Sequence, residues 1–286
     1  MNSKLIDAFW IFIRGLCMGS ADIVPGVSGG TIALITGIYE RLIGAISNIK
    51  FRWIKPLVHG DLHGFWAKLK EDFDFELFIP LFLGIGIAFL SLAKVINFCL
   101  NVYTAYTFAF FLGLIVASAY ILFTELDEVT VKSFIIAAVF AILTFIFVGL
   151  NPIAANHSLP IIFISAIIAI CAMILPGISG SFLLLLLGQY QYMLGCLSSL
   201  KFTDIFTFVV GAAIGILGFS RVIKWLLANY RAATVSALIG IMVGTIRLPY
   251  VKMATSLAGV NFIGLIVLMV IGFVLIVVLE KQFKMV

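Results

Sequence analysis

Residues 25–30 read Pro-Gly-Val-Ser-Gly-Gly, and residues 176–181 read Pro-Gly-Ile-Ser-Gly-Ser. Each stretch interrupts a long apolar run. Because Pro removes a backbone donor and Gly permits open conformations, a helix stops there and starts again. The two stretches lie 151 residues apart (176 − 25 = 151), and further pairs match at this offset without a gap: Gly37 with Gly188, Tyr39 with Tyr190, Gly44 with Gly195 and Lys50 with Lys201. The chain therefore contains a duplicated, broken apolar segment.

A second alignment extends the duplication to the following segments. Its offset is 127 residues (211 − 84 = 127), and it pairs Gly84 with Gly211, Lys94 with Arg221, Tyr103 with Tyr230, Thr107 with Thr234 and Gly113 with Gly240. The difference of 24 (151 − 127 = 24) indicates an insertion in the hydrophilic stretch at about 48–76. We expect a first repeat at 1–150, which carries this insertion, and a second repeat at 151–286.

The composition indicates a membrane protein. Of the 286 residues, 63% are hydrophobic and 11% are charged, whereas soluble domains carry about 25% charged residues. Apolar runs of about 18 or more residues recur, and they are continuous rather than alternating as in a barrel. We expect an all-α polytopic membrane protein in which each repeat is a broken or re-entrant hairpin plus three transmembrane helices. The predicted helices lie near 77–98, 103–123, 132–149, 205–227, 232–247 and 261–280.

Other features exclude classes of function. The net charge of +5 suits cytoplasmic loops and anionic headgroups, and no basic, aromatic-interleaved soluble region indicates nucleic-acid binding. The four cysteines lie in apolar segments without ligand spacing, so we expect no metal and no other cofactor. The insertion mixes basic residues with Trp53 and Trp66, which is typical of a segment at the cytoplasmic interface. We expect no cleavable signal, because Arg14 interrupts the first apolar run.

The basic residues predict the orientation. With the amino terminus inside, most loop Lys and Arg residues are cytoplasmic, and those left outside are Lys94, Lys201, Arg247 and Lys252. If each broken segment returns to the side from which it started, a repeat crosses the membrane an odd number of times. The repeats are then inverted, both termini are cytoplasmic and the turn at 151–160 is external. If each broken segment is one interrupted span, the copies are parallel. The charge bias favours inversion.

The broken segments are the predicted anion site. Ser28 and Ser179 suit the N-cap position of the outgoing helices, whose free N–H groups and dipole attract anions. Two inverted copies would point these helix starts at the membrane midplane, as in many secondary transporters. The alternative is that Pro and Gly only kink two packed helices. The predicted binding set is Arg14, Ser28, Gly29, Gly30, Thr31, Lys94, Ser179, Gly180, Ser181 and Arg221.

Ionisable residues in apolar runs are costly and are candidates for function. Arg14 and Asp22 could form an ion pair, or Arg14 could bind an anion while Asp22 carries a proton. Glu40, which shares a helix face with Thr36 and Tyr39, is the second coupling candidate.

Each remaining polar residue also has a structural interpretation. Glu40 could instead pair with Arg41 or Lys50. The side chains of Lys94 and Arg221 could simply extend to the membrane–water interface without binding an anion. Arg41 and Arg247 are expected to be interface anchors. Close helix packing is expected at Gly15/Gly19, Gly211/Gly215 and Gly240/Gly244.

The first motif also satisfies G-x-S-x-G, as in intramembrane serine proteases. A serine nucleophile needs a base within reach, and His59, His63 and His157 all lie outside the apolar runs. A catalytic serine would also need no copy in the other repeat. We therefore predict that the chain is not an enzyme and keep a membrane hydrolase as the third hypothesis.

Residues 21–31, Ala-Asp-Ile-Val-Pro-Gly-Val-Ser-Gly-Gly-Thr, followed by Gly-Ile-Tyr-Glu at 37–40, resemble the bacterial polyprenyl-phosphate transporter family (PopT type), formerly a domain of unknown function. The resemblance covers nearly the whole chain. It implies a multi-pass plasma-membrane protein that moves undecaprenyl phosphate from the outer to the inner leaflet for re-use in cell-envelope synthesis. The second copy departs from the first, because Asp22, Gly30 and Arg14 are matched by Met173, Ser181 and Ser165. We expect the two half-sites to do different jobs.

A polyprenyl phosphate suits these features, because its headgroup cannot cross hydrocarbon while its tail need not leave it. The protein must supply a polar path with lateral openings. The alternative is a transporter or channel for a small inorganic anion, which the same helix starts would serve. Proton or cation coupling stays open, as does assembly into a homo-oligomer.

Overall fold

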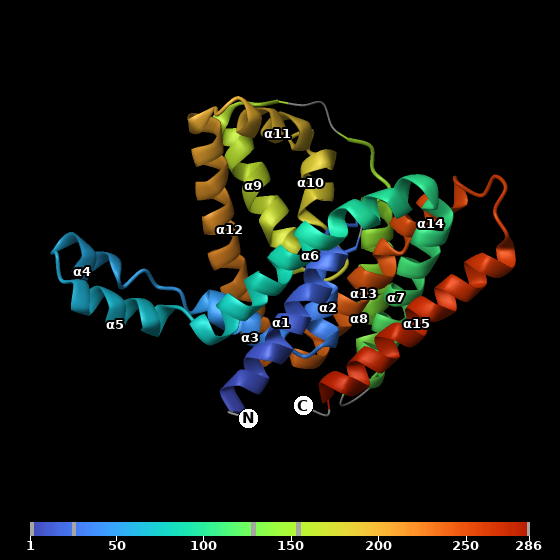
Figure 1. Ribbon diagram of the computed structural model, residues 1–286, viewed down its shortest axis with the longest axis horizontal. Helices are drawn as coiled ribbons and strands as arrows, with labels where there is room; N and C mark the ends of the chain where they lie inside the picture. The colour runs from blue at the N-terminus through green and yellow to red at the C-terminus, as the bar shows by residue number, and fades with distance from the viewer. Residues whose placement is uncertain (1–2, 25–26, 127–129, 153–155, 285–286) are drawn as a thin grey trace.

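The computed structural model describes residues 3–24, 27–126, 130–152 and 156–284, and every regular element among them is a helix (Figure 1). Pro25 and Gly26 of the first motif lie outside the described residues. The helices are α1 (Ser3–Asp22), α2 (Gly29–Ile35), α3 (Tyr39–Ser47), α4 (Ile54–Val58), α5 (Leu62–Asp72), α6 (Phe75–Val102), α7 (Thr104–Thr124), α8 (Val131–Phe147), α9 (Leu159–Ile174), α10 (Gly180–Leu186), α11 (Tyr190–Ser198), α12 (Phe202–Asn229), α13 (Arg231–Thr245), α14 (Arg247–Ala254) and α15 (Phe262–Lys284).

Several helices are long and apolar enough to cross a membrane. Among the described residues there are five: α6, α7, α12, α13 together with α14, and α15. A sixth is obtained if α10 and α11, which are bent by 103° relative to one another, count as one broken span. The helices α8 and α9 are apolar but shorter. The predicted all-helical, multi-pass membrane protein is confirmed.

The helix bounds recur at the two sequence offsets. The bounds of α10 and α11 are those of α2 and α3 moved by 151 (180 − 29 = 151), and the bounds of α12 are those of α6 moved by 127 (202 − 75 = 127). The expectation that Thr36, Tyr39 and Glu40 share one helix is wrong. Gly37 and Gly188 have φ angles of 72° and 68° and turn the chain between the two short helices, a conformation that glycine adopts without strain.

Four helix pairs form most of the packing. Within each half of the chain, α1 packs along α6, and α9 packs along α12. Between the halves, α15 packs along α7, and α8 packs along α13. After its break, the first half continues with α6, α7 and α8, and the second half with α12, α13 and α15. The third of these helices in each half therefore packs against the second one of the other half.

Glycines allow these helices to approach closely. A Cβ at Gly84 would meet the carbonyl oxygen of Phe12, and a Cβ at Gly211 would meet that of Phe163, so the same contact occurs in both halves. A Cβ on any glycine of the three predicted pairs would likewise collide with a neighbouring helix. Their predicted role in close packing is confirmed.

We call the side on which α1 begins and α15 ends the termini face, and the opposite side the far face (Figure 1). Ion pairs lie at the termini face, among them Arg41 with Asp7 and Lys284 with Glu125. Lys4 pairs with Glu76 at 2.8 Å between Nζ and Oε1. Lys224, near the end of α12, donates to the Asn48 side chain at 2.9 Å. Because α6 begins and α12 ends at this face, these equivalent helices run in opposite directions.

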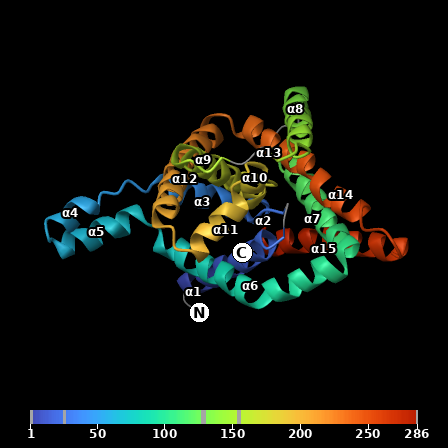
Figure 2. The ribbon, with the colours of Figure 1, turned by 90° about the horizontal axis from the view of Figure 1, so that it is seen from above.

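The hydrophilic insertion forms α4 and α5, which project sideways from the other helices in both views (Figures 1 and 2). Trp53 and Phe65 meet edge to face with ring centroids 5.9 Å apart. Trp66 is 57% exposed. The segment thus presents aromatic rings outside the helical body, as expected of an interfacial element.

Candidate functional site

The first break folds the chain back on itself. Asp22, the last residue of α1, accepts the N–H of Gly29 at 2.6 Å. Arg14, about two turns earlier in α1, donates from Nε to the carbonyl oxygen of Thr36 at 3.1 Å. Because these contacts join both ends of α2 to α1, α2 runs back alongside α1.

Two side chains of the protein cap the start of α2. Ser28 has an extended backbone, and its Oγ accepts the N–H of Gly30 at 3.2 Å, so the predicted N-cap is confirmed. The carboxylate of Asp22 is the second acceptor. Arg14 lies at the opposite end of α2, where its guanidinium also stacks over the Phe283 ring at 4.8 Å. The Arg14–Asp22 ion pair is therefore not formed, and that interpretation is wrong.

The second break has different chemistry. Ser179 has the same extended backbone but makes no capping hydrogen bond with its side chain, and its Oγ lies 2.7 Å from the Oγ of Ser181. A Cβ built on Gly180 would lie 3.4 Å from the Cβ of Met173, the counterpart of Asp22. The thioether of Met173 carries no charge, so the start of α10 lacks the carboxylate that caps α2.

The two breaks meet inside the molecule. The N–H of Gly177 donates to Oγ1 of Thr31 at 2.9 Å, and this hydrogen bond is buried. Gly30 is also close to the second break, since a Cβ built on it would lie 3.3 Å from the carbonyl oxygen of Ile174. The contact brings together residues 146 positions apart. Gly30 and Thr31 of the first predicted set thus lie against Ile174 and Gly177, whereas no described hydrogen bond joins them to Ser179, Gly180 or Ser181.

An apolar groove reaches this meeting point. It has a volume of about 370 Å³ and runs between α1, α3, α6 and α9, with Asp22, Gly30 and Met173 among its lining residues. It opens at the surface of the protein beside Phe82, which is 61% exposed. Its second polar group is the hydroxyl of Tyr39, which is buried without a hydrogen-bond partner in the described chain. Apart from the match of Tyr39 with Tyr190, nothing in the sequence indicates that the Tyr39 hydroxyl is buried beside this groove.

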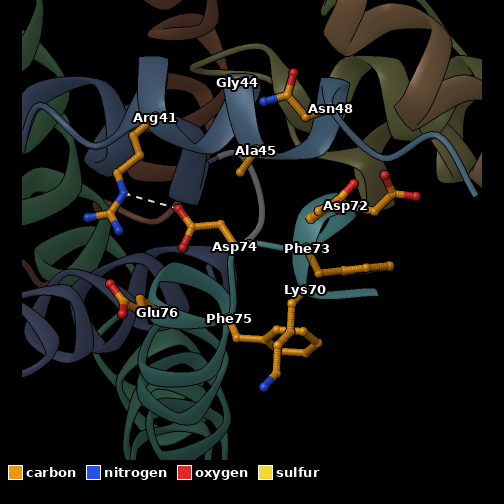
Figure 3. Close-up of a pocket in the computed structure, with 11 residues that line it drawn as sticks. Arg41, Gly44, Ala45, Asn48, Lys70, Asp72, Phe73, Asp74, Phe75 and Glu76 are labelled. Carbon is orange, nitrogen blue, oxygen red and sulfur yellow. Dashed lines mark hydrogen bonds and ion pairs between the residues drawn. The ribbon is translucent and has the colours of Figure 1, made fainter. Parts of the chain in front are cut away.

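A more polar cavity of about 660 Å³ lies at the termini face, between α3 and the junction of α5 and α6 (Figure 3). In it, Arg41 donates to Asp74 at 3.4 Å. Burial alone would raise the pKa of the Asp72 carboxyl, but hydrogen bonds from Arg52 outweigh this and hold the pKa below its usual value. Glu71 and Glu76 add two further carboxylates. The excess of negative charge disfavours a phosphate here.

The remaining candidates lie away from the meeting point. Arg221 donates to the carbonyl oxygens of Ser47 at 3.4 Å and Ile49 at 3.1 Å, after the end of α3. Lys94 is exposed on α6, and no described residue pairs with it. Glu40 pairs with Arg231 at 3.2 Å. The interpretation that Glu40 pairs with Arg41 or Lys50 is therefore wrong.

The described contacts place no histidine beside either motif serine. His157 lies 3.1 Å from the Oε1 of Gln189, measured from Nδ1, and stacks on Tyr192 with centroids 3.9 Å apart. His59 contacts the carbonyl oxygen of Lys55 at 2.7 Å. In this structure Ser28 is a helix cap.

Known proteins resemble this chain over most of its length. The profile of an undecaprenyl phosphate translocase-like family matches residues 18–267. A Vibrio cholerae protein named polyprenyl-phosphate transporter is 37% identical over 246 residues, which cover 86% of this chain and 79% of that protein. A Staphylococcus aureus protein of the same name is 30% identical over 285 residues, which cover 93% and 94%. No solved structure matches.

Proposed function

Because the chain belongs to the undecaprenyl phosphate translocase-like family, we propose that it moves a polyprenyl phosphate across the bacterial plasma membrane from the outer to the inner leaflet. The carrier lipid would then be re-used in cell-envelope synthesis. Both relatives are named as polyprenyl-phosphate transporters, and the helices form a multi-pass membrane protein. A charged headgroup does not cross hydrocarbon unaided. The protein has to supply a path for the phosphate, whereas the tail can stay in lipid.

The observation that carries this proposal is the meeting of the two breaks. Irregular backbone at membrane depth is tolerated where it lines a path or is covered by protein. The groove beside Phe82 leads from the surface of the protein to this point. A lipid tail could therefore lie in the groove while the phosphate passes the breaks. The bond between Gly177 and Thr31 would have to open for passage.

We propose that donors of residues 28–31 and 179–181 hold the phosphate in transit. The carboxylate of Asp22 already accepts the Gly29 N–H. A phosphate therefore competes with this carboxylate at the first break, while the second break has no such competitor. Arg14 would provide countercharge from the far end of the 7-residue α2. Lys94 and Arg221 would act nearer the ends of the path.

The proposal includes two inverted repeats, 1–150 and 151–286, and cytoplasmic termini. The opposite directions of α6 and α12 support inversion, as does the return of α2 along α1. Two broken segments that return to the side where they started leave three crossings in each repeat. This arrangement would place the second break toward the outer leaflet and the first toward the inner leaflet.

The test uses purified protein in liposomes that carry fluorescent polyprenyl phosphate in both leaflets. A membrane-impermeant quencher reports how fast the lipid exchanges between the leaflets. We expect faster exchange than in protein-free liposomes, and no acceleration for the neutral polyprenol with the same tail. Uptake of radioactive inorganic phosphate without lipid movement would contradict the proposal and support the small-anion transporter.

A further inference from the structure

A third cavity, of about 570 Å³, lies toward the far face between α10, α14 and the end of α8. Its walls include Phe182 and Leu185 of α10, and its basic residues are Arg247 and Lys252 of α14. The volume is within the range of about 300–1,000 Å³ that is typical of small-ligand sites. A pocket with an apolar wall and two cations suits an amphipathic anion.

The guanidinium of Arg247 is held in a fixed position. Its Nη1 donates to the carbonyl oxygen of Phe145 at 2.8 Å, and its central carbon lies 4.7 Å from the centroid of the Phe145 ring. The absence of a side chain at Gly149 leaves room for it, because a Cβ there would collide with the guanidinium. These contacts use one nitrogen of a group with five N–H donors.

No described carboxylate pairs with Arg247 or with Lys252. Three other arginines do have such partners: Arg41 with Asp7, Arg52 with Asp72 and Arg231 with Glu40. Two cations in one partly apolar cavity repel each other unless an anion joins them. The cavity therefore has charge that the described chain does not neutralise.

The cavity also adjoins the second break. Thr245, two residues before Arg247, approaches Gly177 so closely that a Cβ on that glycine would lie 2.8 Å from its Oγ1. Phe182 and Leu185 belong to α10, which begins directly after the break. An anion in this cavity would be next to the proposed path.

The arrangement occurs in one half only. At the offset of 127, Arg247 corresponds to Tyr120 and Lys252 corresponds to Glu125 (247 − 127 = 120; 252 − 127 = 125). Glu125 pairs with Lys284. The equivalent place at the termini face thus offers an already paired carboxylate and no cation pair for an anion.

We infer that the cavity is a docking site for the phosphate of a polyprenyl phosphate in the outer leaflet, before the phosphate reaches the breaks. Arg247 binds phosphate oxygens through its planar fork, Lys252 adds a second charge, and the wall of α10 contacts the first isoprene units. This inference rests on the proposed function. It adds a capture step at one face, which the termini face lacks.

The test measures binding of farnesyl phosphate to the protein in nanodiscs. We expect R247Q and K252Q each to weaken binding about tenfold or more, since each removes a charge-assisted contact. R247K should lose less than R247Q. The matched control is K201Q, since Lys201 is a far-face cation outside the cavity, over the Tyr192 ring at 5.3 Å. Binding of farnesol should be the same in all variants, and inorganic phosphate should compete only weakly.

Wild-type affinity for farnesyl phosphate in K252Q would overturn the inference, because this exposed side chain can change without disturbing the fold. Inorganic phosphate that competes as well as the lipid would also overturn it, in favour of a free-phosphate site. The leaflet assay separates the two proposals. If the wild type moves no polyprenyl phosphate, the proposed function fails. If the wild type and both variants move it at equal rates from a limiting concentration, only the docking site fails.

Discussion

At the scale of single residues, the hydroxyl of Thr31 links the two broken segments. It accepts the buried N–H of Gly177 and belongs to the first half, whereas its counterpart in the second half is Phe182, which has no hydroxyl. The bond therefore has no repeat-related copy. A buried backbone donor needs an acceptor, so we expect this hydrogen bond to stabilise the contact between the two breaks.

Thr31→Val keeps the shape of the side chain but leaves the Gly177 N–H without its acceptor. We expect a loss of about 1–3 kcal/mol of stability, seen as a lower melting temperature in detergent. Thr31→Ser keeps the hydroxyl and is the matched control. Equal melting of the Val variant and the wild type would show that the bond contributes nothing.

Asp22 and Glu40 are the carboxylates proposed to couple transport to protons. Moving a phosphate inward opposes an inside-negative potential by about 2.3 kcal/mol per charge per 100 mV, and a co-transported proton would offset this. Asp22→Asn is a clean variant, because an amide oxygen can still accept the Gly29 N–H. We expect it to fold normally and to lose the response of transport to an imposed pH gradient in proteoliposomes.

Glu40→Gln needs a second control, because it also breaks the pair with Arg231. Arg231→Gln breaks the same pair without removing a carboxylate, so a shared defect would identify a structural role. Wild-type rates and gradient response in both Asp22→Asn and Glu40→Gln would exclude proton coupling through these residues. Passive equilibration of the lipid would then be the better hypothesis.

At the scale of helices, the sequence predicted the long elements and the breaks well, because hydropathy and two constant offsets report them directly. It did not predict the turns at Gly37 and Gly188, since a glycine in an apolar run does not reveal its φ angle. The contact of Arg14 with Phe283 could not be predicted from local sequence patterns, because Phe283 comes from the opposite end of the chain. The cavity at Arg247 was missed for the same reason: it depends on where α8 and α10 lie relative to α14.

Packing of α1 on α6, and of α9 on α12, depends on glycines with no space for a side chain. Gly84→Ala and Gly211→Ala should each destabilise the protein by about 1–3 kcal/mol, because the added methyl would collide with the carbonyl oxygen of Phe12 or Phe163. Gly86→Ala and Gly218→Ala are controls in the same two helices, where a Cβ meets no atom within 4 Å. Thermal unfolding in detergent should separate the pairs. If all four variants melted alike, the contacts would not matter.

At the scale of the whole molecule, the distribution of loop Lys and Arg residues favours the proposed cytoplasmic termini. Asn156 precedes α9 and should then be external. In a variant without native cysteines, Asn156→Cys should react with an impermeant maleimide on intact cells. Lys55→Cys, in the insertion, should react only after the cells are opened. Labelling of Asn156→Cys from the cytoplasmic side alone would contradict the orientation.

The exchange of packing partners between the halves also has a consequence for biosynthesis. During translation α7 and α8 enter the membrane before α15 and α13, their main neighbours, exist. Until the second half is inserted, α7 and α8 lack these packing partners. We therefore expect each half alone to be degraded in a cell. Two separate polypeptides, 1–150 and 151–286, should be degraded when expressed singly and should accumulate and co-purify when expressed together. Stable accumulation of either fragment alone would show that the halves mature independently.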